Sequence, residues 1–162
     1  MPLVYDAIDA EDIALAKRLI LEGNDVNEHY DGYDWDTPLH QAILVGDEEL
    51  VLLLIQHGAN VLDKDFNEYT PLTLAASEGR EAIVSLLLEN GAEPSINVQG
   101  DAGYTALHAA AANGNAAIVA TLLEHGADAA LTTEYGDTAM RLAERIGNKD
   151  VVDILRRCKT AA

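Results

Sequence analysis

The sequence predicts an all-α solenoid of stacked helix-turn-helix units, on three observations. A threonine motif recurs at Thr37, Thr70, Thr105 and Thr138, with spacings of 33, 35 and 33 residues. A glycine motif keeps step with it, and apolar residues between the two fall in pairs at helical spacing. Periods of this length are typical of repeat architectures, in which each unit buries its apolar face against its neighbours.

The threonine motif opens four units of the predicted solenoid. It reads TPLHQA at 37–42, TPLTLA at 70–75, TALHAA at 105–110 and, less closely, TAMRLA at 138–143. The glycine motif reads GNDVN at 23–27, GANV at 58–61, GAEP at 91–94 and GADA at 126–129, and its first copy places another unit ahead of Thr37. The 162 residues are therefore predicted to form a single domain, 1–162, of five repeats with approximate bounds 1–34, 35–67, 68–102, 103–135 and 136–162.

These motifs resemble those of the ankyrin repeat family. The family pattern runs roughly G-x-T-P-L-H-x-A-A, a glycine, I-V-x-x-L-L and then G-A-D-V-N, and the chain matches it in register over essentially its whole length. The resemblance implies a solenoid of paired helices with projecting β-hairpin or loop fingers. It also implies protein recognition as the usual function.

Each threonine is expected to begin a short inner helix. Its side chain can cap free backbone N–H groups, and a proline in the next position costs nothing because that N–H has no helical partner. Alanines such as those at 109–112 keep this helix slim, so neighbouring units can stack closely. A glycine that tolerates positive φ then ends the helix, and these glycines are Gly46, Gly79, Gly114 and Gly147.

The second helix of each unit carries paired apolar residues at helical spacing. The pairs are clearest at 83–88, 118–123 and 151–155. They are expected to bury against adjacent repeats, since no single unit covers its own apolar face. The segment from each glycine motif to the next threonine corresponds to the finger of the family.

Two fingers lack the glycine that the family pattern has two residues before the threonine. Trp35 and Glu68 stand there, and bulky side chains accept positive φ poorly. Asp31-Gly32 can supply the turn in one finger, and Asn67 is the residue expected to take the turn conformation in the other. The first unit lacks Thr-Pro, which fits a capping repeat that faces water on one side.

The net charge excludes several classes of partner. Ten Lys and Arg against 28 Asp and Glu give a net charge of −18, with a pI near 4.3. Nucleic-acid binding depends on basic residues that neutralise phosphates, so DNA, RNA and anionic membranes are not expected partners. The one cysteine, Cys158, cannot form an internal disulfide, and the start of the chain has no signal-peptide pattern. We therefore expect a cytoplasmic protein, and we expect it to be a monomer.

No residue pattern predicts catalysis, a bound metal or a cofactor. His40 and His108 occupy the histidine position of the threonine motif, where the resemblance implies structural hydrogen bonds. The histidines recur with the repeat and do not cluster at the spacing of a zinc site. The basic residues around Cys158 could lower its pKa, although a plain role in the terminal helix is the alternative. The protein is therefore expected not to be an enzyme.

Aromatic side chains gather in the fingers. Tyr and Trp are enriched at binding hot spots, so rings placed on projecting loops indicate an interface. The alternative is that the rings pack on neighbouring fingers and shield them from water. Seven of the eight aromatic residues lie in these segments: Tyr30, Tyr33, Trp35, Phe66, Tyr69, Tyr104 and Tyr135.

Acidic residues are concentrated ahead of the final repeat. From Leu19 to Met140 there are 21 acids and two bases, Lys64 and Arg80, whereas residues 141–162 hold six bases and three acids. An acidic face with rigid rings would steer and hold a basic protein surface. Solubility of an elongated molecule is the alternative interpretation.

These observations predict a non-enzymatic module that binds a basic protein, and inhibition of that protein is one form the function can take. A general adaptor and a self-associating structural subunit are alternatives, and an enzyme or small-molecule binder is a remote one. Leu44 and Val45 are expected to form an exposed apolar spot beside Trp35. The expected contact residues, placed by register from each threonine, are Tyr33, Asp34, Trp35, Asp36, Leu44, Val45, Phe66, Asn67, Tyr69, Ser77, Glu78, Asp101, Tyr104, Asn113, Glu134, Tyr135 and Asp137.

Overall fold

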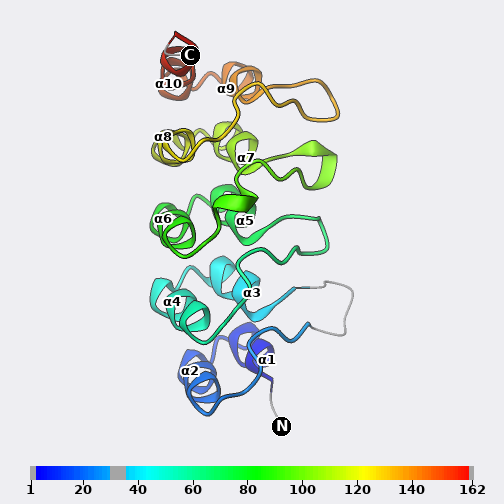
Figure 1. Cartoon of the computed structure of the whole chain (residues 1–162), viewed down its shortest axis with the longest axis vertical. Coiled ribbons are helices and arrows are strands. Elements are labelled where there is room, and N and C mark those ends of the chain that lie inside the picture. The colour runs from blue at the N-terminus through cyan, green and yellow to red at the C-terminus, as the bar shows by residue number, and fades with distance from the viewer. Residues whose placement is uncertain (1–2, 30–35, 161–162) are drawn as a thin grey trace.

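Ten α-helices form two columns in the part of the chain that the structure describes (Figure 1). The structure, a computed structural model, describes residues 3–29 and 36–160, with side chains as far as Cys158. None of these residues lies in a strand, so the predicted all-α solenoid is confirmed and its described fingers are loops. The helices are α1 Val4–Asp9, α2 Ile13–Leu21, α3 Pro38–Val45, α4 Glu48–Gln56, α5 Pro71–Ser77, α6 Glu81–Glu89, α7 Ala106–Ala112, α8 Ala116–Glu124, α9 Ala139–Ile146 and α10 Lys149–Thr160, with 3-10 turns η1 Glu93–Ser95 and η2 Asp101–Gly103.

Each repeat contributes one helix to each column. The odd-numbered helices form an inner column, from whose side the fingers project, and the even-numbered helices form an outer column (Figure 1). Along the inner column α5 packs against α3 and α7, and α7 packs against α9. Each inner helix also contacts the outer helix that follows it. The fingers and inner helices therefore share one side of the stack, away from the outer column.

The threonine motif starts the inner helices as the sequence predicts. Thr70 Oγ1 accepts a hydrogen bond from the backbone N–H of Thr73 at 3.3 Å, and Thr138 Oγ1 accepts one from Arg141 N–H at 3.3 Å. Asp and Asn side chains do the same at the outer helices, where Asp47 caps α4 by accepting from Leu50 N–H at 2.9 Å. Such caps satisfy backbone donors that have no partner inside the helix.

The core between the columns is aliphatic. Leu54, Leu87 and Leu122 of the outer helices and Leu72 and Leu107 of the inner helices have at most 1% of their surface exposed. Burial of such side chains supplies most of the free energy of folding in a solenoid, because each repeat contacts only its neighbours. The sequence predicts that the large rings lie in the fingers and not in the core. The structure confirms this, because Tyr5 is the one aromatic residue in the described core.

The turn before Thr70 differs from the sequence prediction. Glu68 itself takes positive φ, at +60°, and Asn67 does not. The reason lies in Asp65, whose Oδ1 accepts hydrogen bonds from the N–H groups of Asn67 and Tyr69, both at 2.8 Å, and whose backbone O accepts from Glu68 N–H at 3.0 Å. These bonds fix the geometry of the turn, and Glu68 takes the positive φ that Gly103 and Gly136 take at the same position before Thr105 and Thr138.

Candidate protein-binding surface

Three fingers end in the same closed turn. The N–H of Asp65 donates to the carbonyl O of Tyr69 at 2.9 Å, and Gly100 N–H donates to Tyr104 O at 2.9 Å. In the finger before α9, Thr133 N–H donates to Asp137 O at 3.0 Å. The four-residue spacing is the same in each, so the tips present corresponding residues at corresponding places.

Neighbouring fingertips are also joined to one another. The N–H of Asp101 donates to the carbonyl O of Asn67 at 2.9 Å, and the N–H of Glu134 donates to Ala102 O at 2.9 Å. Each bond links one finger to the next along the stack. The three described fingers therefore form one connected ladder along the side of the inner column.

Gly100 allows the first and second described fingers, those before α5 and α7, to approach closely around Tyr69. A Cβ atom on Gly100 would overlap the Tyr69 ring and lie 2.9 Å from the carbonyl O of Glu68. Tyr69 thus packs directly on the backbone of the neighbouring finger. Burial, with the nearby Asp101 and Tyr104, raises the pKa of the Tyr69 hydroxyl.

Replacing Gly100 with alanine is expected to lower the free energy of unfolding by about 1–3 kcal/mol, because the added methyl forces the Tyr69 ring or the finger backbone to move. Thermal or urea unfolding measures the change. The same substitution made in a Tyr69→Ala background should cost less, since the ring is then absent. Equal costs in both backgrounds would mean that Tyr69 does not pack on Gly100.

The finger aromatics divide into two kinds. Tyr69 and Tyr104 are half-buried, and the Tyr104 ring lies edge-on to His108 with centroids 5.9 Å apart. Phe66 and Tyr135 project, with 65% and 77% of their surface exposed. The packing interpretation therefore describes Tyr69 and Tyr104, and for Phe66 and Tyr135 the interface stays a prediction. Tyr69 and Tyr104 brace the fingers, and Phe66 and Tyr135 are available to a partner.

The finger before α3 falls mostly outside the described residues. Tyr33, Asp34 and Trp35, all expected contact residues, belong to that part, while Asp36 is described and half-buried. On α3, Leu44 and Val45 each have 38% of their surface exposed. The expected apolar spot therefore exists on the helix, and its side next to Trp35 lies outside the description.

The remaining inner-helix positions are polar. Glu78 and Asn113 are exposed, and Ser77 is half-buried. The amide Nδ2 of Asn113 donates to the backbone carbonyl of Ser77, which joins α7 to α5. Asn113 thus has a bracing contact as well as an exposed surface.

The acids of the fingers are not equally available. Asp101 and Glu134 are exposed, as is Asn67. Asp137 is different, because its side chain is only 16% exposed and lies between two arginines. Its Oδ2 is 3.0 Å from Arg145 Nη1, and its Oδ1 is 3.5 Å from Arg141 Nε. Asp137 is thus a counter-ion within the chain, and its expected contact with a partner stays a prediction.

Two exposed residues of α9 share the register of Leu44 and Val45 and were not among the expected contact residues. Arg145 occupies the register of Leu44, and Ile146 that of Val45, when the threonine spacing is carried to Thr138. Ile146 has 50% of its surface exposed, and the Arg145 side chain 64%. The register that located Leu44 also locates these two residues when it is carried to Thr138.

His40 and His108 lie under the fingers with no more than 1% of their surface exposed. In each, Nδ1 lies 2.9 Å from the hydroxyl of the threonine that begins the helix. His108 Nε2 also meets the carbonyl O of Leu131 at 3.1 Å, whereas His40 Nε2 finds no hydrogen-bond partner among the described residues. Burial lowers the pKa of His108, and it lowers the pKa of His40 to about 4, so both rings are neutral at pH 7.

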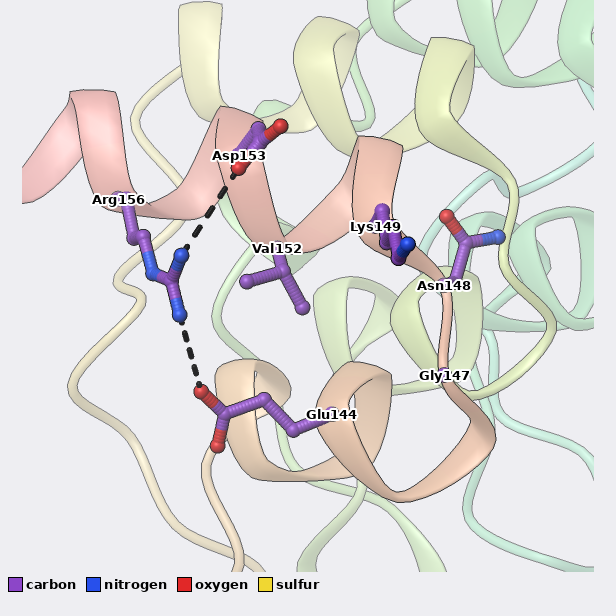
Figure 2. Close-up of a pocket in the computed structure, with 7 residues that line it drawn as sticks. All are labelled: Glu144, Gly147, Asn148, Lys149, Val152, Asp153 and Arg156. Carbon is purple, nitrogen blue, oxygen red and sulfur yellow. Dashed lines mark ion pairs between the residues drawn. The ribbon is translucent and has the colours of Figure 1, made fainter.

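A shallow hollow of about 400 Å³ lies at the far end of the stack, between α9 and α10 (Figure 2). Arg156 of α10 spans it, 3.8 Å from Glu144 of α9 and 3.9 Å from Asp153 (Figure 2). At the corresponding places one repeat earlier stand Ala111, which is fully buried, and Leu123. Charged side chains thus make this face of the fifth repeat polar, and the hollow lies away from the fingertips.

Within residues 3–29 and 36–160, no group of three or more His, Cys, Asp or Glu side chains is placed to hold a metal ion. No helix in the same ranges is long and apolar enough to cross a membrane.

Two sequence profiles of known repeats match the chain. The one described as ankyrin repeats (3 copies) covers residues 4–98, and the one described as ankyrin repeats (many copies) covers residues 87–143. Together they run from α1 into α9, across all the described fingers.

Curated relatives share a stretch of these repeats. The 2-5A-dependent ribonuclease of Homo sapiens is 38% identical over 74 residues, which are 46% of this chain and 10% of that protein. The potassium channel AKT3 of Oryza sativa subsp. japonica is 35% identical over 74 residues, 46% of this chain and 8% of that protein. The matched segment is therefore a small fraction of the length of either relative.

Proposed function

This chain belongs to the ankyrin repeat family, and we propose that it is a non-enzymatic module that binds a basic protein through its fingers and inner helices. Ankyrin repeats generally mediate protein–protein interactions, and solenoids do so through their extended concave surfaces. Fold alone does not name a partner, so the proposal depends on the side chains of this surface.

The observation that carries the proposal is the exposure of Phe66 and Tyr135. In a chain with eight aromatic residues, these two rings are 65% and 77% exposed at the tips of the ladder. Large rings bury more surface than other side chains, so a partner that covers these two would gain more contact area from them than from their neighbours. They are the natural anchors of an interface.

Charge supports a basic partner. Asp101 and Glu134 are exposed beside the rings, and Glu68 is exposed at the tip that carries Phe66. Lys64 is the only base on that tip, and it pairs with Glu68 at 2.8 Å. The acids therefore exceed the bases along the ladder, which favours encounter with a cationic surface.

A photo-crosslinking amino acid placed at Phe66 tests the proposal in a lysate of the cell of origin. A matched control carries it at Ala117, an exposed residue of α8 in the outer column. We expect proteins of high pI to crosslink from position 66 and not from position 117. Crosslinking from 117 alone, or to acidic proteins only, contradicts the proposal.

Phe66→Ala and Tyr135→Ala are expected to weaken binding of the captured protein by about 2 kcal/mol each, roughly 30-fold in Kd. Folding should change little, because both rings are exposed. Calorimetric titration measures the affinity, and Glu81→Lys on α6 is the control for a charge change on the outer column. A weaker complex with the control and an unchanged one with both ring variants would place the partner on the opposite side of the stack.

A further inference from the structure

The inner helices present one pair of residues each at the same register, seven and eight positions after the threonine. We refer to these pairs as the inner stripe: Leu44 and Val45 on α3, Ser77 and Glu78 at the end of α5, Ala112 and Asn113 at the end of α7, and Arg145 and Ile146 on α9. The stripe begins with an apolar pair, continues through polar ones, and ends in a cation beside an exposed isoleucine. Its chemistry thus changes along the stack.

Each of the three described fingers beside the stripe carries an exposed acid. Glu68, Asp101 and Glu134 are exposed on successive tips, and Lys64 neutralises only the first of them. A partner that lies along these tips therefore meets negative charge over most of its length.

The α9 end of the stripe has the opposite sign. Arg141 and Arg145 lie one helical turn apart with 67% and 64% of their side chains exposed. Asp137 contacts both, so two cations share one carboxylate and one positive charge remains in excess. Glu144 belongs to a separate group in the hollow between α9 and α10, where Glu144 and Asp153 lie 3.8 and 3.9 Å from Arg156. The excess positive charge faces the same side as the acidic fingertips.

We propose that this surface binds an extended segment of the partner whose lysines or arginines lie on the fingers of α5 and α7 and whose acidic side chain lies on Arg141 and Arg145. The inference rests on the proposed function and adds an orientation to it. A uniformly basic segment would place a cation on the α9 arginines, and like charges across an interface disfavour that arrangement. An acidic residue followed by an apolar one matches the arginines and Ile146.

The length of the segment follows from the spacing of the helices. Neighbouring packed helices are about 8–10 Å apart, so the three steps from α3 to α9 span roughly 24–30 Å. An extended chain advances about 3.3 Å per residue, and about eight residues cover this distance. Lysine at alternate positions keeps the positive charges of such a segment on one face.

Two fluorescent peptides of this design test the proposal. Both are acetylated and amidated, have about eight residues with alternating lysine and alanine, and end in either Glu-Leu or Gln-Leu. The peptide that ends in Glu-Leu should bind about three- to fivefold more tightly at low ionic strength, the size expected for an exposed ion pair. Fluorescence anisotropy measures both affinities.

The double variant Arg141→Gln, Arg145→Gln should remove this difference and leave the affinity for the Gln-Leu peptide unchanged or higher. The variant Arg141→Lys, Arg145→Lys keeps the charges and should keep most of the preference. Thermal melts of each variant check that the fifth repeat stays folded.

The outcomes separate this inference from the proposed function. If wild-type protein binds both peptides equally, and Phe66→Ala weakens both, the inference is overturned and the binding surface stands. If the preference survives in the Arg-to-Gln variant, the acidic residue is bound elsewhere and the inference is again overturned. If neither peptide binds, both the proposed function and the inference fail.

Discussion

Replacing Leu87 with alanine is expected to lower the free energy of unfolding by about 2–5 kcal/mol. Leu87 lies on α6 with none of its surface exposed, next to the equally buried Leu88 and Val84. The outer helix α6 packs against α4, α5 and α8, so the missing side chain leaves a cavity that rigid neighbours on three sides cannot fill. Leu122 of α8, also fully buried, should behave in the same way.

Urea unfolding followed by circular dichroism measures these changes. Leu62→Ala is the matched control, because Leu62 has 41% of its surface exposed and lies in a loop. Its substitution should change stability by less than about 0.5 kcal/mol. Changes this small at both Leu87 and Leu122 would contradict the packing of the outer column.

Acidification from pH 7 to pH 4 is expected to remove roughly 3 kcal/mol of stability through His40 alone. Burial lowers the pKa of His40 from an ordinary 6.5 to about 4 in the folded protein, against the opposing effects of the Tyr69 and Asp63 backbone and the Asp63 carboxylate. Below pH 6.5 the unfolded chain binds a proton at this ring that the folded protein does not bind. Stability is therefore fully present above pH 6.5 and falls as the pH approaches 4.

The contribution of His40 is isolated by a variant. In α5 the same register holds Thr73, whose hydroxyl lies 3.2 Å from that of Thr70, so threonine fits this position without a titrating group. His40→Thr should lose less stability than wild type between pH 7 and pH 5, with a difference of about 2 kcal/mol. The carboxylates are the same in both proteins, so their contribution to the pH dependence of stability cancels in the comparison. Parallel stability curves would show that the His40 ring is not desolvated.

The helical stack could be predicted because the same threonine, glycine and apolar motifs recur in each repeat, in register. Each threonine begins an inner helix, and each apolar pair at 83–88, 118–123 and 151–155 has at least one buried member. Local capping and period agree with the packing at every repeat, which makes the register insensitive to any one irregular residue.

The turn at Glu68 could not be predicted from propensity. A single-residue preference favours Asn67 for positive φ, but three hydrogen bonds to Asp65 decide the geometry. The sequence shows that polar groups are present in this turn. It does not show which of them accepts a hydrogen bond from which N–H group, because that depends on the three-dimensional arrangement.

For a similar reason, the sequence does not show which aromatic and acidic side chains of the fingers are exposed and which are packed or paired. Tyr69 and Phe66 stand three positions apart on one finger, yet one packs on Gly100 and the other is 65% exposed. Asp137 has the same sequence context as an exposed finger acid until α9 turns Arg141 and Arg145 toward it. Contacts between neighbouring repeats, which a single unit does not reveal, decide each case.

The hydrogen bonds between fingertips, from Asp101 to Asn67 and from Glu134 to Ala102, fix the spacing of the fingers along the proposed binding surface. A solitary loop adjusts to its ligand and loses conformational freedom on binding, whereas linked fingers lost that freedom when the chain folded. The distance between the Phe66 and Tyr135 rings is therefore set when the chain folds and does not adjust when a partner binds. Two candidate ligands with the same side chains at different spacings are then distinguished by geometry alone. A change of ligand range would come from altering finger length, as the two extra residues between Thr70 and Thr105 already do, more readily than from exchanging side chains at the tips.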